Sequence, residues 1–79
     1  MLRKKEPKVI FTFRTTADAM ETERLCRDQG AAGRLIPVPR AISAGCGMAW
    51  CAPVEERGSL EALFAGNGIE WEEAAEMMF

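Results

Sequence analysis

Apolar and polar residues alternate near the N-terminus of the chain, over residues 8–13. Successive side chains of a β-strand point to opposite faces of a sheet. Val9, Phe11 and Phe13 therefore fall on one face of an extended segment. The β-branched and aromatic residues of this stretch favour the same conformation, so the pattern predicts a strand with one buried face.

A helical pattern follows directly after this strand. Thr15 has the side chain of an N-cap, and Asp18 places a negative charge in the first turn, where the helix dipole favours it. Helical spacing puts Cys26 on the inner stripe, which predicts a buried thiol that behaves as a small hydrophobe. Gly30 is expected to end the helix.

Two short strands are expected in the middle of the chain, over residues 34–39 and 47–52. Pro37 and Pro39 lack the backbone N–H that a sheet ladder needs, so the first of these strands should lie at an edge of the sheet. Pro53 is expected to end the second strand.

The C-terminal third predicts a second helix over residues 54–66. Gly58 weakens the first half of this helix, which favours an ordered start at Ser59. Residues 69–71 can begin a fourth strand. Residues 72–79 combine helical propensity with an apolar Met-Met-Phe end, which is typical of a tail or of a segment that docks on a partner.

The element order β-α-β-β-α-β predicts an α+β fold of the ferredoxin-like type, a four-stranded antiparallel sheet with two helices on one face. We expect residues 1–79 to form a single domain with its core at about residues 8–71. A chain of 79 residues, of which 48% are hydrophobic, builds only a small core. Function should therefore lie on a loop, on an open sheet face or at an interface.

Composition changes the range of chemistry to be considered. The chain has no histidine, which excludes Cys/His zinc ligation and a Cys-His catalytic pair within one chain. No apolar run approaches the ~20 residues that span a bilayer, and no signal peptide is recognisable. We expect a cytoplasmic protein without membrane contact, metal or cofactor, in which the three cysteines are buried hydrophobes or reactive thiols.

Charge is unevenly distributed along the chain. Residues 1–40 hold nine basic and five acidic side chains, whereas residues 41–79 hold one basic and seven acidic side chains. No dense basic patch is interleaved with aromatic residues, so nucleic-acid binding is not expected. The simplest account of the asymmetry is a solvated surface.

Cys46 is the candidate reactive group, because it lies between Gly45 and Gly47 in a turn before a strand. Glycines remove side-chain cover from a neighbour, and backbone N–H groups gathered in a turn favour an anion such as a thiolate. Arg40 and Arg14 are candidate cationic neighbours that would lower the pKa of the thiol. The alternative is a small residue that fills a tight turn.

Cys51 follows Cys46 at C-x4-C spacing. If it points to the open sheet face, its thiol is exposed and could resolve or relay a sulfur atom held on Cys46. The alternatives are an incidental thiol, a Cys46/Cys51 redox switch, and a dimer that supplies four thiolates to a metal. Two cysteines without another soft ligand cannot complete a tetrahedral metal site in one protomer.

Four segments resemble the DUF3343 family of selenium/sulfur carrier-like proteins: residues 13–19, 33–40, 42–49 and 68–70. The specific part is a Pro-x-Pro-Arg run that leads into a Ser-x-x-Cys-Gly turn. The resemblance implies that Cys46 is the carrier thiol and that Arg40 and Ser43 shape its turn.

Two positions depart from the family pattern. The position of Cys51 is basic or polar in similar sequences, so the second thiol is a feature of this chain. The position of Arg14 is often a histidine in the family, and this chain lacks whatever acid/base role a histidine would serve there.

The resulting functional hypothesis is a carrier or accessory protein rather than a stand-alone enzyme. Cys46 would hold sulfur or selenium as a persulfide or selenyl-sulfide, accept it from a donor protein such as a cysteine desulfurase, and present it to an acceptor protein. A homo-oligomer is compatible with the apolar C-terminus. The alternative hypothesis is a non-catalytic protein-interaction module in which Cys46 is structural.

Overall fold

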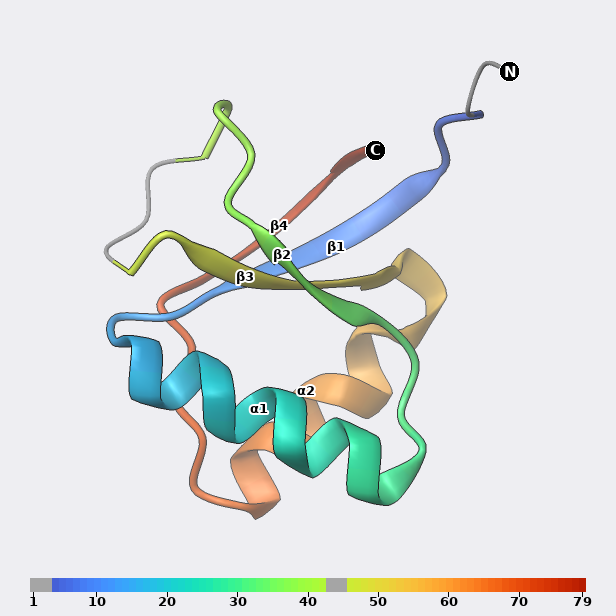
Figure 1. Cartoon of the computed structure of the whole chain (residues 1–79). Helices are drawn as coiled ribbons and strands as arrows, with labels where there is room; N and C mark the ends of the chain where they lie inside the picture. Colours follow the sequence, from blue (N-terminus) through green and yellow to red (C-terminus); the bar gives the residue numbers. More distant parts are fainter. Residues whose placement is uncertain (1–3, 43–45) are drawn as a thin grey trace.

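The computed structural model describes residues 4–42 and 46–79 and has the expected α+β, ferredoxin-like architecture (Figure 1). A four-stranded sheet has the order β2-β3-β1-β4, and every neighbouring pair is antiparallel. Both helices lie against the same face of the sheet. In chain order the elements are β1 (Pro7–Thr12), α1 (Thr16–Gln29), β2 (Arg34–Pro37), β3 (Met48–Pro53), the 3-10 turn η1 (Val54–Glu56), α2 (Arg57–Gly66) and β4 (Glu73–Met78).

The core between the sheet and the helices confirms the face of β1 that the sequence predicts to be buried. Val9, Phe11 and Phe13 are completely buried in it. Phe11 meets the ring of Phe64 from α2 edge-on, with 5.0 Å between the ring centroids, and that of Trp71 at 5.6 Å. We call this cluster the helix-side core. Its other buried members are Ala19, Leu25, Cys26, Trp50, Ala52, Leu60 and Ile69.

Helix α1 begins and ends as the sequence predicts. The side chain of Thr15 accepts a hydrogen bond from the backbone N–H of Asp18 at 3.1 Å, which satisfies one of the free N–H groups of the first turn. Gly30 adopts the left-handed conformation at the C-terminal end, with φ 67°.

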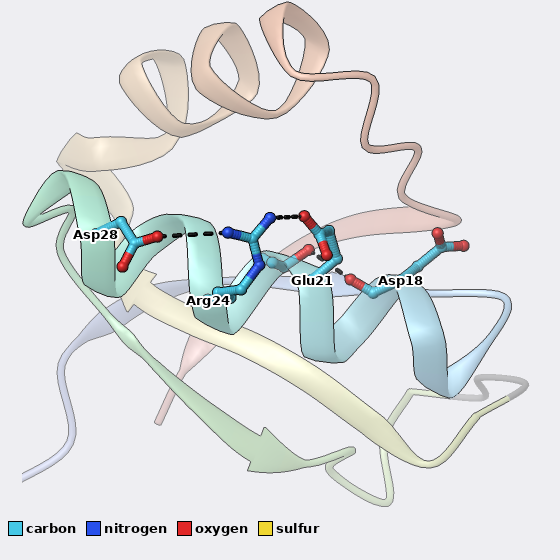
Figure 2. Close-up of polar contacts among 5 residues, drawn as sticks. Asp18, Glu21, Arg24 and Asp28 are labelled. Atoms are coloured by element: carbon cyan, nitrogen blue, oxygen red, sulfur yellow. Dashed lines mark hydrogen bonds and ion pairs between the residues drawn. The ribbon is translucent and has the colours of Figure 1, made fainter.

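The outer face of α1 carries a chain of ion pairs. Figure 2 shows the guanidinium of Arg24 between Glu21 and Asp28, with 3.4 Å to the Asp28 carboxylate. These two carboxylates raise the pKa of Arg24 above its ordinary value, with Glu21 as the main cause. Because all three side chains are exposed to solvent, the pairs add little to stability, and we assign them a surface role.

A second apolar cluster covers the sheet face that the helices leave free. Its buried members, only 0–6% exposed, are Ile10, Ile36, Ala49 and Cys51. Val38 and Ile42 from the β2–β3 connection pack against it, as do Met77 and Phe79 at the C-terminal end. The face expected to be open is therefore apolar and buried at its centre.

The C-terminal third differs from the sequence prediction. The fourth strand begins at Glu73, not in residues 69–71. The backbone N–H of Ile69 donates to the carbonyl of Phe64 at 2.9 Å, so this residue closes the end of α2 and its side chain enters the helix-side core. Most of the segment expected as a tail or docking segment pairs with β1 instead.

Within the expected range of residues 54–66, helix α2 begins at Arg57 rather than at Ser59, so that Gly58 lies inside its first turn. The short 3-10 turn η1 leads directly from β3 into the helix. Within the described ranges, no helix combines the length and apolar character that crossing a membrane requires.

Candidate functional site

Cys46 lies immediately before β3 and is half-buried. Its side chain packs against the helix-side core, and its thiol donates to the carbonyl of Met48 at a sulfur–oxygen distance of 3.4 Å. The strand that follows therefore fixes the direction of the Sγ atom. Ser43 and Gly45, which the sequence assigns to the same turn, lie outside the described residues.

Gly47 shapes the exit from the turn. Its φ of +83° is a conformation that residues with a Cβ rarely adopt, and among the described residues other than its two chain neighbours no heavy atom lies within 4 Å of the position a Cβ would take. The carbonyl of Gly47 accepts the N–H of Val38 at 3.0 Å, which closes the connection between β2 and β3. Gly47 thus supplies the left-handed backbone conformation between Cys46 and β3.

The sheet register places Cys46 at the end where β1 passes into α1. Thr12, the last residue of β1, pairs with Ala49 of β3. Cys46, just before β3, therefore lies at the same end as the Thr15 cap of α1, and Figure 1 shows the start of β3 and the β1–α1 link on the same side. This end of the molecule presents the backbone N–H groups of the first helical turn.

The two candidate arginines lie on connections near this end, and both are exposed. Arg14 belongs to the link between β1 and α1. Arg40 lies in a turn that the N–H of Ile42 closes on the carbonyl of Pro39 at 3.0 Å. In residues 4–42 and 46–79, no hydrogen bond joins either guanidinium to the Cys46 thiol.

Arg14 instead borders a surface depression of about 560 Å³. Trp71 and Glu70 contribute its aromatic and acidic sides. The other lining residues are Ala65, Gly68 and Ile69. Sequence analysis did not connect Arg14 with Trp71, because they are far apart in the chain and meet only through the fold.

Cys51 lies on the sheet face opposite the helices, as alternation along β3 predicts, but its expected exposure is wrong. The residue is only 4% exposed, because the β2–β3 connection and the end of β4 cover the second cluster to which it belongs. Cys46 contacts the helix-side core instead. The structure therefore places these two thiols on opposite faces of the sheet and does not bring them together.

Cys26 is 1% exposed on the inner face of α1, which confirms the expected core position. Burial raises the pKa of this thiol to about 11, because the thiolate would lose its hydration. The group is therefore a neutral thiol at neutral pH. Of the three cysteines, Cys46 alone is not buried.

A protein-family model described as "Putative Se/S carrier protein-like" matches residues 8–76. The chain belongs to this family. No match was found among the curated proteins or among the solved structures. The match to the Se/S carrier-like family runs from β1 into β4 and includes Cys46 together with both candidate arginines.

Sequence analysis missed one group at the candidate site of this Se/S carrier-like protein. The backbone carbonyl of Met48 is the acceptor that orients the Cys46 thiol. Every residue type has a backbone carbonyl, so the sequence does not single out a main-chain acceptor. Only the position of Met48, two residues after the cysteine, could have suggested this hydrogen bond.

Proposed function

We propose that this chain carries sulfur or selenium as a covalent adduct on Cys46. The observation that carries the proposal is the accessibility of this thiol: Cys26 and Cys51 are 1% and 4% exposed, whereas Cys46 is only half-buried. Membership of the Se/S carrier-like family supports the same assignment. A carrier needs access to two protein partners more than it needs a deep pocket.

The proposed loading step is a thiol exchange. The Cys46 thiolate attacks the terminal sulfur of a donor persulfide, R–S–SH, and a new S–S bond forms as the donor S–S bond breaks. The bonding electron pair leaves with the donor as its thiolate, the proton stays on the transferred sulfur, and no external oxidant is needed. A donor perselenide, R–S–SeH, follows the same balance. Transfer to an acceptor thiol repeats the exchange in the opposite sense.

The residues around the thiol have supporting parts in this proposal. Arg40 supplies positive charge on the connection that precedes Cys46, and Arg14 supplies it at the same end of the sheet. Gly47 shapes the exit from the turn that precedes β3, and the family resemblance implies further turn residues at Ser43 and Gly45, outside the described residues. Cys51 takes at most a secondary part, because its burial leaves little room for direct exchange. The setting is a cytoplasmic one with donor and acceptor proteins as partners.

The test is intact-mass spectrometry of the reduced protein after incubation with glutathione persulfide, or with a cysteine desulfurase and cysteine. Wild type should gain the mass of one sulfur atom, and Cys46→Ser should not. Cys51→Ala is the matched control, because it removes a thiol from the same strand region and should load normally. Failure of wild type to load, or equal loading of Cys46→Ser, would contradict the proposal.

Alkylation provides a second readout on the same samples. A small reagent such as iodoacetamide should modify Cys46 of the native protein first, and persulfide loading should protect that position. Peptide mapping assigns the modified residue. Preferential modification of Cys26 or Cys51 under native conditions would argue against the assignment of the carrier thiol.

A further inference from the structure

The two edges of the sheet differ in their capacity to pair with another strand. The strand order places β2 at one edge and β4 at the other. The β2 edge is short and is interrupted by Pro37 and then Pro39, which lack the N–H groups that extend a sheet. Strand β4 has six residues and no proline. It therefore retains a usable edge.

The register identifies the backbone groups that face this edge. Phe79 and Glu6 exchange two hydrogen bonds, with N–O distances of 2.9 and 3.3 Å. In an antiparallel pair, hydrogen-bonded positions alternate with non-bonded ones. Met77 and Ala75 consequently bond toward β1, while the N–H and C=O groups at the even-numbered positions point outward. These outward positions are Ala74, Glu76 and Met78.

Charge is unevenly distributed along the same edge, because Lys8 balances Glu6 beside Phe79 through an ion pair at 3.5 Å and Lys4 and Lys5 add net positive charge there. At its C-terminal end, Met78 and Phe79 border a depression together with the exposed Lys4 and Lys5. At its N-terminal end, the chain enters the strand through acidic residues, Glu70, Glu72 and Glu73. An antiparallel copy would set the acidic end of one strand against the basic end of the other. The pattern is therefore self-complementary.

We propose that a second copy of this chain pairs antiparallel along β4 and extends the two sheets into one. In the favoured register, Ala75 lies opposite the partner's Ala75, and Ala74 exchanges hydrogen bonds with the partner's Glu76. Two small side chains meet at the two-fold axis. The alternative register centred on Glu76 would oppose two carboxylates directly, which is destabilising.

The same register has a consequence for the charged ends. It places the partner's Glu73 opposite Met77, and Met77 in turn pairs with Lys8 of β1. The partner's Glu72 then lies opposite Met78, the residue beside Lys4 and Lys5. Since Met78 is 55% exposed in the single chain, pairing would also remove apolar surface from water. Exposed charge pairs make such an association sensitive to salt.

Light scattering coupled to size exclusion tests the proposal at low salt and in the presence of a thiol reductant. Wild type should give twice the 8.7 kDa mass of one chain and dissociate as salt is raised. Lys4→Glu with Lys5→Glu, and separately Glu72→Lys with Glu73→Lys, should each weaken association roughly tenfold or more. Circular dichroism verifies that both variants, which change exposed residues, are folded.

Mixing the two charge-reversed variants is the decisive measurement. Each alone opposes like charges at both ends, whereas the mixture opposes unlike charges at both ends and should restore the dimer. A monomeric wild type, or a dimer that neither variant weakens, overturns the proposal. A mixture that stays monomeric also overturns it. These outcomes do not depend on Cys46, so they test the dimer separately from the proposed carrier function.

Discussion

The indole N–H of Trp50 donates to the carbonyl of Ala32 at 3.1 Å, and this bond holds the start of β2 against β3. Gly33, the next residue, lies close to the indole nitrogen of Trp50. A Cβ atom at this position would lie 2.5 Å from Nε1 of Trp50 and 2.6 Å from the carbonyl oxygen of Cys51. Its φ of +114° also disfavours any residue with a side chain. Close packing thus admits only glycine here.

Gly33→Ala is therefore expected to lower the free energy of unfolding by about 2 kcal/mol or more, because it combines backbone strain with displacement of Trp50. Urea unfolding followed by Trp fluorescence measures the loss. In a small domain this is a large fraction of the total stability, so the variant should unfold at a much lower urea concentration.

Gly58→Ala is the matched control for this substitution. Gly58 lies in α2 and does not have a positive φ, and no heavy atom of the described residues lies within 4 Å of the place that an alanine methyl would occupy. Alanine should leave stability unchanged or raise it by about 0.5–1 kcal/mol. An equal loss in both variants would contradict the explanation based on close packing at Gly33.

Local sequence patterns predicted those elements whose features depend on residues close together in the sequence. The alternation of Val9, Phe11 and Phe13 indicated the buried face of β1, and Thr15 and Gly30 marked the ends of α1. These features depend on the geometry of a single strand or helix, so residue spacing alone contains the information.

The four-stranded sheet was predicted, but the position of its last strand and the covering of its second face depend on distant contacts and were not. Ile69 has the residue type of a strand, yet it closes α2 and fills the helix-side core. The acidic and Met-rich β4 forms because β1 offers it a partner. Cys51 is buried because Val38, Ile42, Met77 and Phe79 cover its face. None of these contacts leaves a periodic signal in the sequence.

The candidate site was predictable in part. The sequence singled out Cys46, and the structure leaves it the only one of the three thiols that is not buried. The sequence could not indicate that Cys46 contacts one face of the sheet and Cys51 the other. The side to which the Cys46 side chain points depends on the backbone conformation of Gly47, which strand alternation does not predict.

Thr15→Ala should lower the free energy of unfolding by about 1 kcal/mol, because it removes the acceptor of the Asp18 backbone N–H. The cap lies at the end of the sheet that holds Cys46, so loosening of the first helical turn is also expected to raise hydrogen exchange there. Urea unfolding measures the stability, and amide exchange locates the change.

Thr15→Ser retains a hydroxyl acceptor and serves as the control for the cap. It should lie within a few tenths of a kcal/mol of wild type. If alanine and serine were equally stable, the hydrogen bond to Asp18 would contribute nothing, and the fraying of α1 would need another cause.

Stability should decrease at alkaline pH because of Cys26. Burial raises the pKa of its thiol from 9.0 to about 11 in the folded chain. Between these values the unfolded chain releases the Cys26 proton while the folded chain retains it, so the unfolded state binds fewer protons and stability falls as pH rises. Below pH 9 this contribution is fully present, and above pH 11 no further loss from this group is expected.

Cys26→Ala isolates this contribution from the titration of lysines and other groups. Urea midpoints of both proteins, measured under reducing conditions from about pH 7 to about pH 11, should first converge and then cross as the pH rises, because only wild type has a thiol to ionise at this position. At neutral pH the variant should be less stable by about 1 kcal/mol, since it leaves a small cavity beside Leu25 and Trp50 in the helix-side core. Parallel pH profiles would show that Cys26 ionises equally in the folded and unfolded chains and would contradict the effect expected from its burial on the inner face of α1.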